Sequence, residues 1–571
     1  MNILKLIPKY TLVLGLTMMW SCNDRLDDVN VNPNGVDLSK ANPNLLMPPV
    51  MTNAAMSYLR LGYEDVGGVA QHIQHDGWYS GVNSYDWGTQ GNQEWTQWYN
   101  MLRNNQLMLD RATTIDSKFH MGVGLTMKSF IFGTITDLWG DAPYTAALSG
   151  AKSDGTITPV FDSQEVIYKG IIEDLKQASA LFATKDNSAY LPNYDVYYAG
   201  DASKWQKFAN SLLLRYYMRV SAKLPDLAKA GIESIYSSGV YIKTPAEDAV
   251  MNYLGTTSDY SWPGAVAWDA EQSGFRRKKP AQTLVSKLLE NKDPRLTVWI
   301  APVHCQWVAD ETLTTPLDEF IRKNGVIQTG VKSLTDVQFQ TEIKAGAKFT
   351  RHYNPKLYTG TGTDAINTGI YVGIPAGMRQ PDFYNRNPTT GQVVQNQHVS
   401  QLADVYRGSS GGLLKARLMS ASETSFILAE AAQKGWSAGS AKEHYEAGVK
   451  NSLTTWGVDD KYGAYIAEKN VAFNNTLAQI IDQKWIASWT GATEAWFDFR
   501  RTGLPALKPG NASPENVLPL RFNYGDNTLN FNSTNADAAV NKLEVTPHSG
   551  LRGKNSPWSK PWIVQGTGKP W

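Results

Sequence analysis

The chain has 571 residues, of which 54 are Lys or Arg and 53 are Asp or Glu, so its formal net charge is +1. This balance, together with the lack of a basic block, argues against a nucleic-acid partner. The length is sufficient for a large hydrophobic core and for about two to four domains. Aromatic residues make up 11% of the chain, and we expect many of them in long polar loops.

The first 21 residues have the layout of an export signal. Lys5 and Lys9 form a short positive leader, residues 10–20 are almost wholly apolar, and the small residue Ser21 follows. A membrane-spanning helix needs about 20 apolar residues, and this run is much shorter. We therefore interpret residues 1–21 as a signal peptide and not as a membrane span.

Cys22 follows this segment directly and has three interpretations: a disulfide partner for Cys305, a free thiol, or a lipid attachment point. A disulfide from the first residue of a flexible arm would constrain little, so lipid attachment is favoured. Met19 and Trp20 depart from the usual lipoprotein pattern, which has Leu three residues and a small residue two residues before the cysteine. Residues 22–40 carry several acids and the segment VNPNGVD, which is typical of a solvated tether.

Hydrophobic residues then recur at helical spacing in many segments of the chain. Two of these segments begin with a capping box, Asp162 with Glu165 and Ser420 with Glu423. The second of them starts a helical pair whose alternation of small and large residues resembles tetratricopeptide repeats. The expected helices lie at 49–61, 95–112, 120–138, 162–182, 203–222, 281–290, 420–436, 440–453 and 476–490.

The helical period fades between about 240 and 415, where Gly, Thr, Pro and Asn are frequent. Aromatic and β-branched residues persist there, so we expect loops and short strands. No linker separates this region from the rest. We expect one domain over 41–571, with a helical scaffold at about 41–235 and 415–505 and the irregular region laid over it.

Seven fragments occur in an order that resembles the SusD/RagB family of Bacteroidetes surface lipoproteins, and they run through most of the chain. They are VNPNGVD, WGDAPYTAAL, DASKWQKFANSLLLRYYMRVS, NKDPRL, SETSFILAEAAQKGW, QKWIASWTGATEAWFDFRRTGLPAL and LPLRFNY. The last fragment departs from the family pattern, because Gly525 and Asp526 follow Tyr524 where Pro and Glu are usual.

The resemblance implies a mostly α, SusD-like fold of stacked tetratricopeptide-like helical pairs with an irregular, loop-rich region packed on them. It also implies a lipid anchor in the outer membrane, facing the cell exterior, and a SusC-like TonB-dependent barrel as partner. The implied role is nutrient capture without catalysis, with oligosaccharide as the usual cargo. A peptide-binding member of the family and a surface glycoside hydrolase are the alternatives. No cofactor or metal is expected.

Aromatic residues concentrate in residues 78–99, which hold seven of them in 22 positions. Three, at 95, 98 and 99, have helical spacing, so core packing is the favoured interpretation. The others alternate with Gly, Ser, Asn and Asp, as expected for a loop that presents rings to a ligand. A flat ring can lie against the C–H face of a sugar while nearby amides bond its hydroxyls. The candidate ligand-binding residues are Trp78, Tyr79, Tyr85 and Trp87, with Trp262 and Trp268 as a second set.

Catalytic motifs are weak. The segment RGSSGG at 407–412 satisfies G-x-S-x-G, but no apolar strand precedes it as a hydrolase elbow requires. His72, His75 and Asp76 have no indicated third metal ligand, so hydrogen-bonded histidines are favoured. The carboxylates of EAWFDFRR, at 494 and 498, lie beside two arginines, which indicates a structural ion-pair network. A glycosidase is not ruled out this way, because its two carboxylates need no fixed spacing in sequence.

Overall fold

The structure is a computed structural model that describes residues 40–569 apart from several segments. The segments outside the description are 77–80, 88–94, 151–154, 303–305, 310–316, 319–340, 342–344, 346–348, 353–370 and 380–398. The predicted signal peptide and nearly all of the tether therefore lie outside the described residues, as do Cys22, Cys305, Trp78 and Tyr79.

The described chain is mostly helical. The helices of its N-terminal half are α3 (Pro43–Arg60), a π-helix (Leu61–Asp65), α4 (Val66–Val69), α5 (Gly81–Ser84), α6 (Thr96–Thr114), α7 (Lys118–Trp139), α8 (Gln164–Ala183), α9 (Ala202–Arg219), α10 (Pro225–Ser238), α11 (Ser273–Arg276), α12 (Gln282–Glu290) and α13 (Leu296–Trp299). Those of its C-terminal half are α15 (Ala421–Gln433), α16 (Ala441–Thr455), α17 (Tyr462–Ile466), α18 (Leu477–Ala487), α19 (Ala492–Thr502), α20 (Asp526–Phe531) and α21 (Ser533–Asn541). The expected mostly α architecture is thus confirmed.

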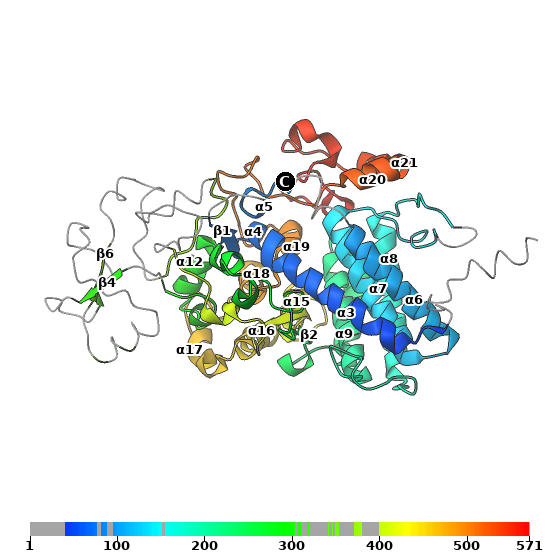
Figure 1. Cartoon of the computed structure of the whole chain (residues 1–571), viewed down its shortest axis with the longest axis horizontal. Coiled ribbons are helices and arrows are strands. Elements are labelled where there is room, and N and C mark those ends of the chain that lie inside the picture. The colour runs from blue at the N-terminus through cyan, green and yellow to red at the C-terminus, as the bar shows by residue number, and fades with distance from the viewer. Residues whose placement is uncertain are drawn as a thin grey trace, which may run out of the picture.

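Helices α6, α7, α8 and α9 pack in sequence order on one side of the molecule, with α3 across them (Figure 1). Nearly all of α7 is buried because α6, α8 and α9 contact it from different sides. A glycine permits the closest approach: a Cβ atom at Gly133 would overlap with the ring of Tyr216 from α9. The stacked pairs α7–α8 and α8–α9 are consistent with the expected tetratricopeptide-like packing.

Helix starts show which capping predictions were correct. Ser420 is the N-cap of α15, and its side chain accepts a hydrogen bond from the backbone N–H of Glu423 at 3.1 Å. For α8 the predicted cap is wrong, because Ser163 and not Asp162 accepts from the backbone N–H of Val166. Asp162 instead accepts from the backbone N–H of Thr145 at 2.7 Å, so it fixes the segment that follows α7.

A second helical layer contains α15, α16 and α18, with α12 and α17 beside them (Figure 1). The pair α15–α16 corresponds to the pair predicted from sequence. Its contact is filled by Phe426 against Tyr445 and by Val449 and Leu453, and Ile480 of α18 packs in the same cluster. The main hydrophobic core includes residues of both layers, from Met47 in α3 to Trp496 in α19. The two ends of the chain therefore share one core.

The strands are short, and they join segments far apart in sequence. Strand β1 (Ile73–His75) pairs antiparallel with β3 (Lys278–Pro280), and Ile73 lies opposite Pro280. Strand β2 (Ala249–Asn252) pairs antiparallel with β7 (Lys415–Met419), which links the two helical layers. A third sheet has the order β4 (Gln306–Ala309), β6 (Phe349–His352), β5 (Leu317–Asp318). Short strands were expected in this region.

Helices α20 and α21 lie near the C-terminus, above the ends of α7 and α8 in Figure 1. They are held to the N-terminal half by contacts with the segment that leads into α8. Within the described residues, no helix combines the length and hydropathy that crossing a membrane requires.

Candidate functional site

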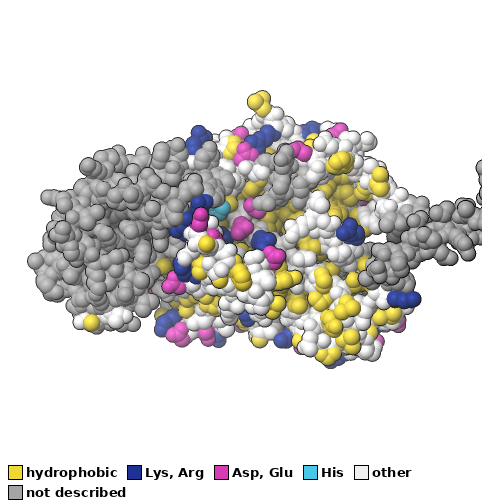
Figure 2. Space-filling model, in the orientation of Figure 1, with side chains coloured by type: hydrophobic (Ala, Val, Ile, Leu, Met, Phe, Trp, Pro, Cys, Tyr) yellow, Lys and Arg dark blue, Asp and Glu magenta, His cyan; other side chains and the backbone are white. Residues whose placement is uncertain are grey.

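An open groove lies where α6 begins, between the segment that follows α7 and helix α20. Its volume is about 240 Å³. Its aromatic side chains are Trp95, Tyr99, Phe161 and Phe531, and its polar side chains are Thr96, Asn527, Thr528 and Asn532. Figure 2 shows exposed hydrophobic side chains over the helical half of the visible face.

The first wall of the groove is a packed aromatic cluster. The ring of Trp95 lies 5.4 Å from that of Tyr99 and 5.4 Å from that of Phe161, measured between ring centroids. The hydroxyl of Tyr99 donates a hydrogen bond of 2.7 Å to the backbone carbonyl of Pro143, and burial raises the pKa of this tyrosine well above its usual value. Because Trp95 also contacts Trp139 in the core, this wall is held rigidly.

The second wall is α20, whose Phe531 side chain is 77% exposed. On the lip opposite, Ile157 is 87% exposed. The side-chain amide of Asn532 donates a hydrogen bond of 2.7 Å to the carbonyl of Pro159, and Asn535 donates one of 3.0 Å to the carbonyl of Thr158. These bonds fix the distance between α20 and the lip.

The groove offers flat apolar surface beside neutral hydrogen-bonding groups. Rings of this kind bind the C–H face of a sugar, and amide and hydroxyl groups bond its hydroxyls. Sequence reasoning assigned Trp95 and Tyr99 to core packing and did not identify Phe161 or Phe531. One feature of the sequence did point to Trp95 and Tyr99: they belong to the same aromatic-rich segment, residues 78–99, as the candidate ligand-binding residues.

The predicted ligand residues have different environments. Tyr85 is fully buried and Trp262 is 1% exposed, so neither ring has a face for a ligand, and the expectation for these two residues is corrected. Tyr85 is buried because its segment folds against the core, and Trp262 packs on Tyr63 with the ring centroids 5.0 Å apart. Trp87 is partly buried, and its ring centroid lies 4.7 Å from that of Phe522. Trp268 is 48% exposed.

Trp268 is held in place by a hydrogen bond of 2.7 Å from its indole N–H to the hydroxyl of Ser261. It lies in the 3₁₀ turn Val266–Trp268, away from the residues that line the groove. Trp268 and Trp87 therefore remain predictions as ligand contacts, as do Trp78 and Tyr79, which lie outside the described residues.

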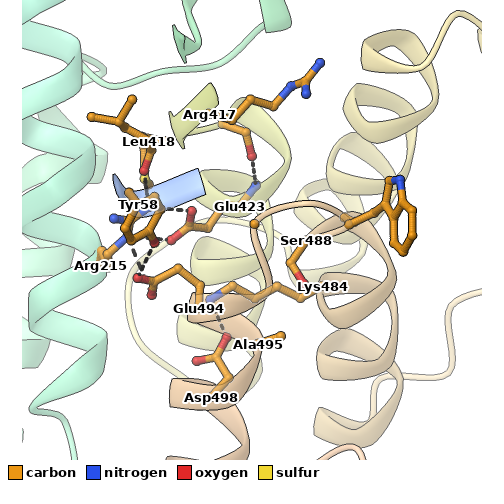
Figure 3. A pocket seen from close by; sticks show the side chains of 15 residues that line it. Tyr58, Arg215, Arg417, Leu418, Glu423, Lys484, Ser488, Glu494, Ala495 and Asp498 are labelled. Carbon is orange, nitrogen blue, oxygen red and sulfur yellow. Dashed lines mark hydrogen bonds and ion pairs between the residues drawn. The ribbon is translucent and has the colours of Figure 1, made fainter. Parts of the chain in front are cut away.

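The carboxylates of α19 belong to a buried network of charges (Figure 3). Glu494 pairs with Arg219 and accepts a hydrogen bond of 2.9 Å from the hydroxyl of Tyr58. Arg215 joins Glu423 at 2.7 Å and lies 3.7 Å from Glu494. The predicted structural ion-pair network is confirmed, and it connects α9, α15 and α19.

The same network continues along α19. Asp498 pairs with Lys484 of α18 at 2.7 Å and with Arg501 at 3.0 Å. Burial alone would raise the pKa of Asp498, but the charges of Lys484 and Arg501 outweigh it and lower the pKa. For Glu494 as well, burial opposes ionisation and Arg215 and Arg219 lower the pKa. Both carboxylates are therefore held ionised, and neither is suited to be a general acid.

A small cavity of about 50 Å³ lies within this network, bordered by Tyr58, Arg215, Lys484 and Glu494 (Figure 3). This volume suits a few water molecules, and an oligosaccharide is far too large for it. The cavity belongs to the structural network.

The other weak motifs have structural surroundings. The ring of His72 lies 4.9 Å from that of Trp485 in the core, and burial lowers the pKa of His72 to about 3. In the part of the chain that is described, no group of three or more potential metal ligands occurs. The segment RGSSGG follows a 3₁₀ helix (Asp404–Arg407) and precedes β7, so it does not form a strand-to-helix elbow.

Comparison with known proteins identifies the family. A family model for SusD-like proteins, described as "Starch-binding associating with outer membrane", matches residues 35–312 and 351–525. The chain therefore belongs to the SusD-like family of nutrient-binding proteins associated with the outer membrane. A comparison with curated proteins finds no match.

Solved structures of the same fold cover nearly the whole chain. A chitin-binding protein is 23% identical with a TM-score of 0.66, over 92% of this chain and 100% of that chain. A SusD homologue from Bacteroides fragilis is 19% identical with a TM-score of 0.66, over 92% of this chain and 99% of its own. A SusD-like protein from Bacteroides thetaiotaomicron is 20% identical with a TM-score of 0.61, over 90% of this chain and 98% of that chain. These structures confirm the SusD-like fold predicted from sequence.

Proposed function

We propose that this protein captures oligosaccharides at the cell surface without cleaving them and passes them to a SusC-like TonB-dependent barrel in the outer membrane. The observation that carries the proposal is the groove between Trp95 and Phe531, in which aromatic rings and neutral polar side chains meet. Membership of the SusD-like family supports it, and so does the chitin-binding protein among the structures of this fold.

The strength of binding follows from the exposed rings. Covering about 100 Å² of apolar surface contributes roughly 2.5 kcal/mol per ring before ordering costs. Two rings then give a dissociation constant between about 1 mM and about 10 µM. Binding of this strength suits a protein that must release its cargo to a transporter.

Attachment to the membrane is proposed to occur through Cys22, which lies outside the described residues. Two or more acyl chains on this cysteine would give stable anchoring, whereas one chain gives only marginal binding. Replacing Cys22 by Ser should move the protein from the membrane fraction to the soluble fraction and abolish labelling with palmitate. Protein that stays in the membrane fraction and is still labelled would contradict this assignment.

Delivery to the barrel requires a complex between the two proteins. Purification of the chain from the outer membrane of its native host should recover a TonB-dependent barrel in stoichiometric amount. If the chain is recovered without any barrel even after mild cross-linking, delivery of the oligosaccharide to a barrel is contradicted. The proposal that the protein binds oligosaccharide would still stand.

Isothermal titration of the purified protein against a panel of neutral oligosaccharides and peptides tests the binding role. Phe531→Ala should lower the affinity for the oligosaccharide by about tenfold, because one exposed ring is removed. Leu551→Ala is the matched control, since Leu551 is fully exposed and does not line the groove. Equal affinity of wild type and Phe531→Ala would show that the groove is not the site.

The same titrations distinguish the alternatives. Chromatography of each oligosaccharide after incubation should show no shorter products. Shorter products would indicate a hydrolase. If only peptides bind, the cargo is peptide and not oligosaccharide.

A further inference from the structure

Three exposed apolar side chains gather at the end of the helical layer where α3 begins. Leu45 lies in the first turn of α3, Ile115 directly follows α6, and Leu191 lies between α8 and α9. Their exposed fractions are 58%, 46% and 46%. We name these three residues the entry face, because they surround the start of α3.

Hydrogen bonds hold the segments of the entry face together. The side-chain carbonyl of Asn44 accepts a bond of 2.8 Å from the backbone N–H of Leu191. Arg111 lies one turn before Ile115, and its guanidinium donates a bond of 3.3 Å to the backbone carbonyl of Ala41. The start of α3 is thereby tied to the end of α6 and to the segment after α8, so the three apolar side chains stand on one framework.

Charged side chains occur in the same segments. Lys40 precedes α3, Lys118 begins α7 and Lys185 follows α8, and the acids Asp116 and Asp186 alternate with them. Because both signs are present, the apolar side chains and not the charge define the face. Lysines beside apolar groups suit a phospholipid surface, where apolar groups enter the acyl boundary and ammonium groups stay among the phosphates.

The place of the entry face along the chain indicates what it meets. Cys22, the proposed lipid attachment point, precedes Lys40 by 18 positions. A chain of this length spans at most about 65 Å. Since α3 starts at Pro43, the entry face surrounds the point through which a lipid anchor would hold the folded domain.

The anchor also makes a weak contact sufficient. Three partly exposed side chains would not hold a free protein on a bilayer, since even a whole myristoyl chain gives only marginal binding. A tether converts docking of the face into an intramolecular step, for which short linkers give effective concentrations of roughly millimolar. A contact that is negligible for the free protein can then orient the anchored one.

We propose that the entry face docks on the lipid surface of the outer membrane, an inference that rests on the proposed lipid anchor at Cys22. Helix α6 ends at this face and begins at the groove, where Trp95 and Thr96 lie. Its 19 residues correspond to a length of about 28 Å. Docking through the entry face therefore holds the groove away from the membrane, where a long oligosaccharide can reach it.

The test uses the full chain with its lipid, reconstituted in phospholipid vesicles. Cys305→Ser leaves Cys22 as the only native cysteine, and lipid attachment blocks its thiol, so an added cysteine alone takes the fluorophore NBD. The label is placed at Ile115→Cys. Leu254→Cys is the matched control, since Leu254 is 70% exposed and lies outside the entry face. Nitroxide-bearing phospholipids quench a label that contacts the acyl chains.

We expect a blue shift and a loss of NBD intensity at position 115 in nitroxide vesicles, and neither change at position 254. Leu45→Ser combined with Leu191→Ser should abolish both changes at position 115, although the protein still floats with the vesicles. Both substitutions are at exposed positions, where effects on stability are usually small. Equal quenching at positions 115 and 254 would overturn the docking.

Flotation of the vesicles separates this inference from the proposed anchor. Protein that floats without quenching at position 115 leaves the anchor intact and removes the docking. Protein that does not float shows that the anchor fails, and the docking fails with it. A blue shift at position 115 that is already present in soluble Cys22→Ser protein would show that the chain itself or a second copy covers the face, which also overturns the inference.

Discussion

The side-chain amide of Asn532 donates a hydrogen bond of 2.7 Å to the backbone carbonyl of Pro159, although 373 positions separate them in sequence. This bond joins the two lips of the groove. The distance between Phe531 and the aromatic wall is therefore set by a contact between distant parts of the chain, and no local sequence determines it.

The first prediction concerns that bond. Asn532→Ala should lower affinity for the oligosaccharide by a few fold, because α20 is no longer fixed to the lip. It should cost about 1 kcal/mol of the free energy of unfolding, the usual contribution of one hydrogen bond. Titration and urea denaturation measure the two effects. Unchanged affinity would show that the lips are positioned in another way.

The buried charge network is predicted to be structural. Arg219→Met leaves the carboxylates of Glu494 and Asp137 without one of their partners, so the free energy of unfolding should fall by about 3–5 kcal/mol. Lys169→Met is the matched control, because it removes an exposed pair with Glu165 and should change stability by less than about 0.5 kcal/mol. Similar losses in both variants would contradict this account.

Two glycine substitutions in helices should have opposite effects. Gly133→Ala places a methyl group into the ring of Tyr216 and should destabilise the protein by about 1–3 kcal/mol. At Gly463 of α17 a Cβ atom meets no neighbour within 4 Å, so Gly463→Ala should be neutral or stabilise by up to about 1 kcal/mol. Thermal denaturation of the two variants is the measurement, and a stable Gly133→Ala variant would contradict the packing of α7 on α9.

The buried side chain of His72 should make the stability of the protein depend on pH. Burial lowers the pKa of His72 to about 3, whereas the unfolded chain binds a proton near its usual pKa of about 6.5. The contribution of the neutral imidazole is therefore complete above about pH 6.5 and is lost as the pH falls towards about 3.

His72→Phe removes this titration. Between about pH 6 and about pH 4 the free energy of unfolding should fall less steeply in the variant, by up to about 1.4 kcal/mol per pH unit. Urea denaturation at a series of pH values measures the slope. Equal slopes in variant and wild type would show that His72 is not the group responsible.

Most helices were predictable because their apolar residues face one side. Helix α15 also carried its cap, Ser420, in the sequence. Helix α10 was not identified, since only Ala228 and Ile232 are buried and the apolar stripe is short. Helix α19 was not identified as a helix, although its charged residues at 494, 498 and 501 recur at helical spacing; nearly all of its residues, charged ones included, are buried.

The candidate site was less predictable than the fold. Its walls come from α6, from the segment before α8 and from α20, and no sequence spacing relates these three segments. The aromatic-rich segment does contribute Trp95 and Tyr99 to the groove, but the sequence analysis assigned these two residues to core packing, and the structure shows both packed against the core. Burial of Tyr85 and Trp262 depends on neighbours distant in sequence, so alternation with polar residues could not reveal it.

A crystal structure of the protein with a neutral oligosaccharide tests the central claim most directly. The account predicts density for the sugar in the groove, with one ring face against Phe531 and hydroxyls near Asn527 and Thr96. Sugar bound elsewhere, with the groove holding only solvent, would contradict it.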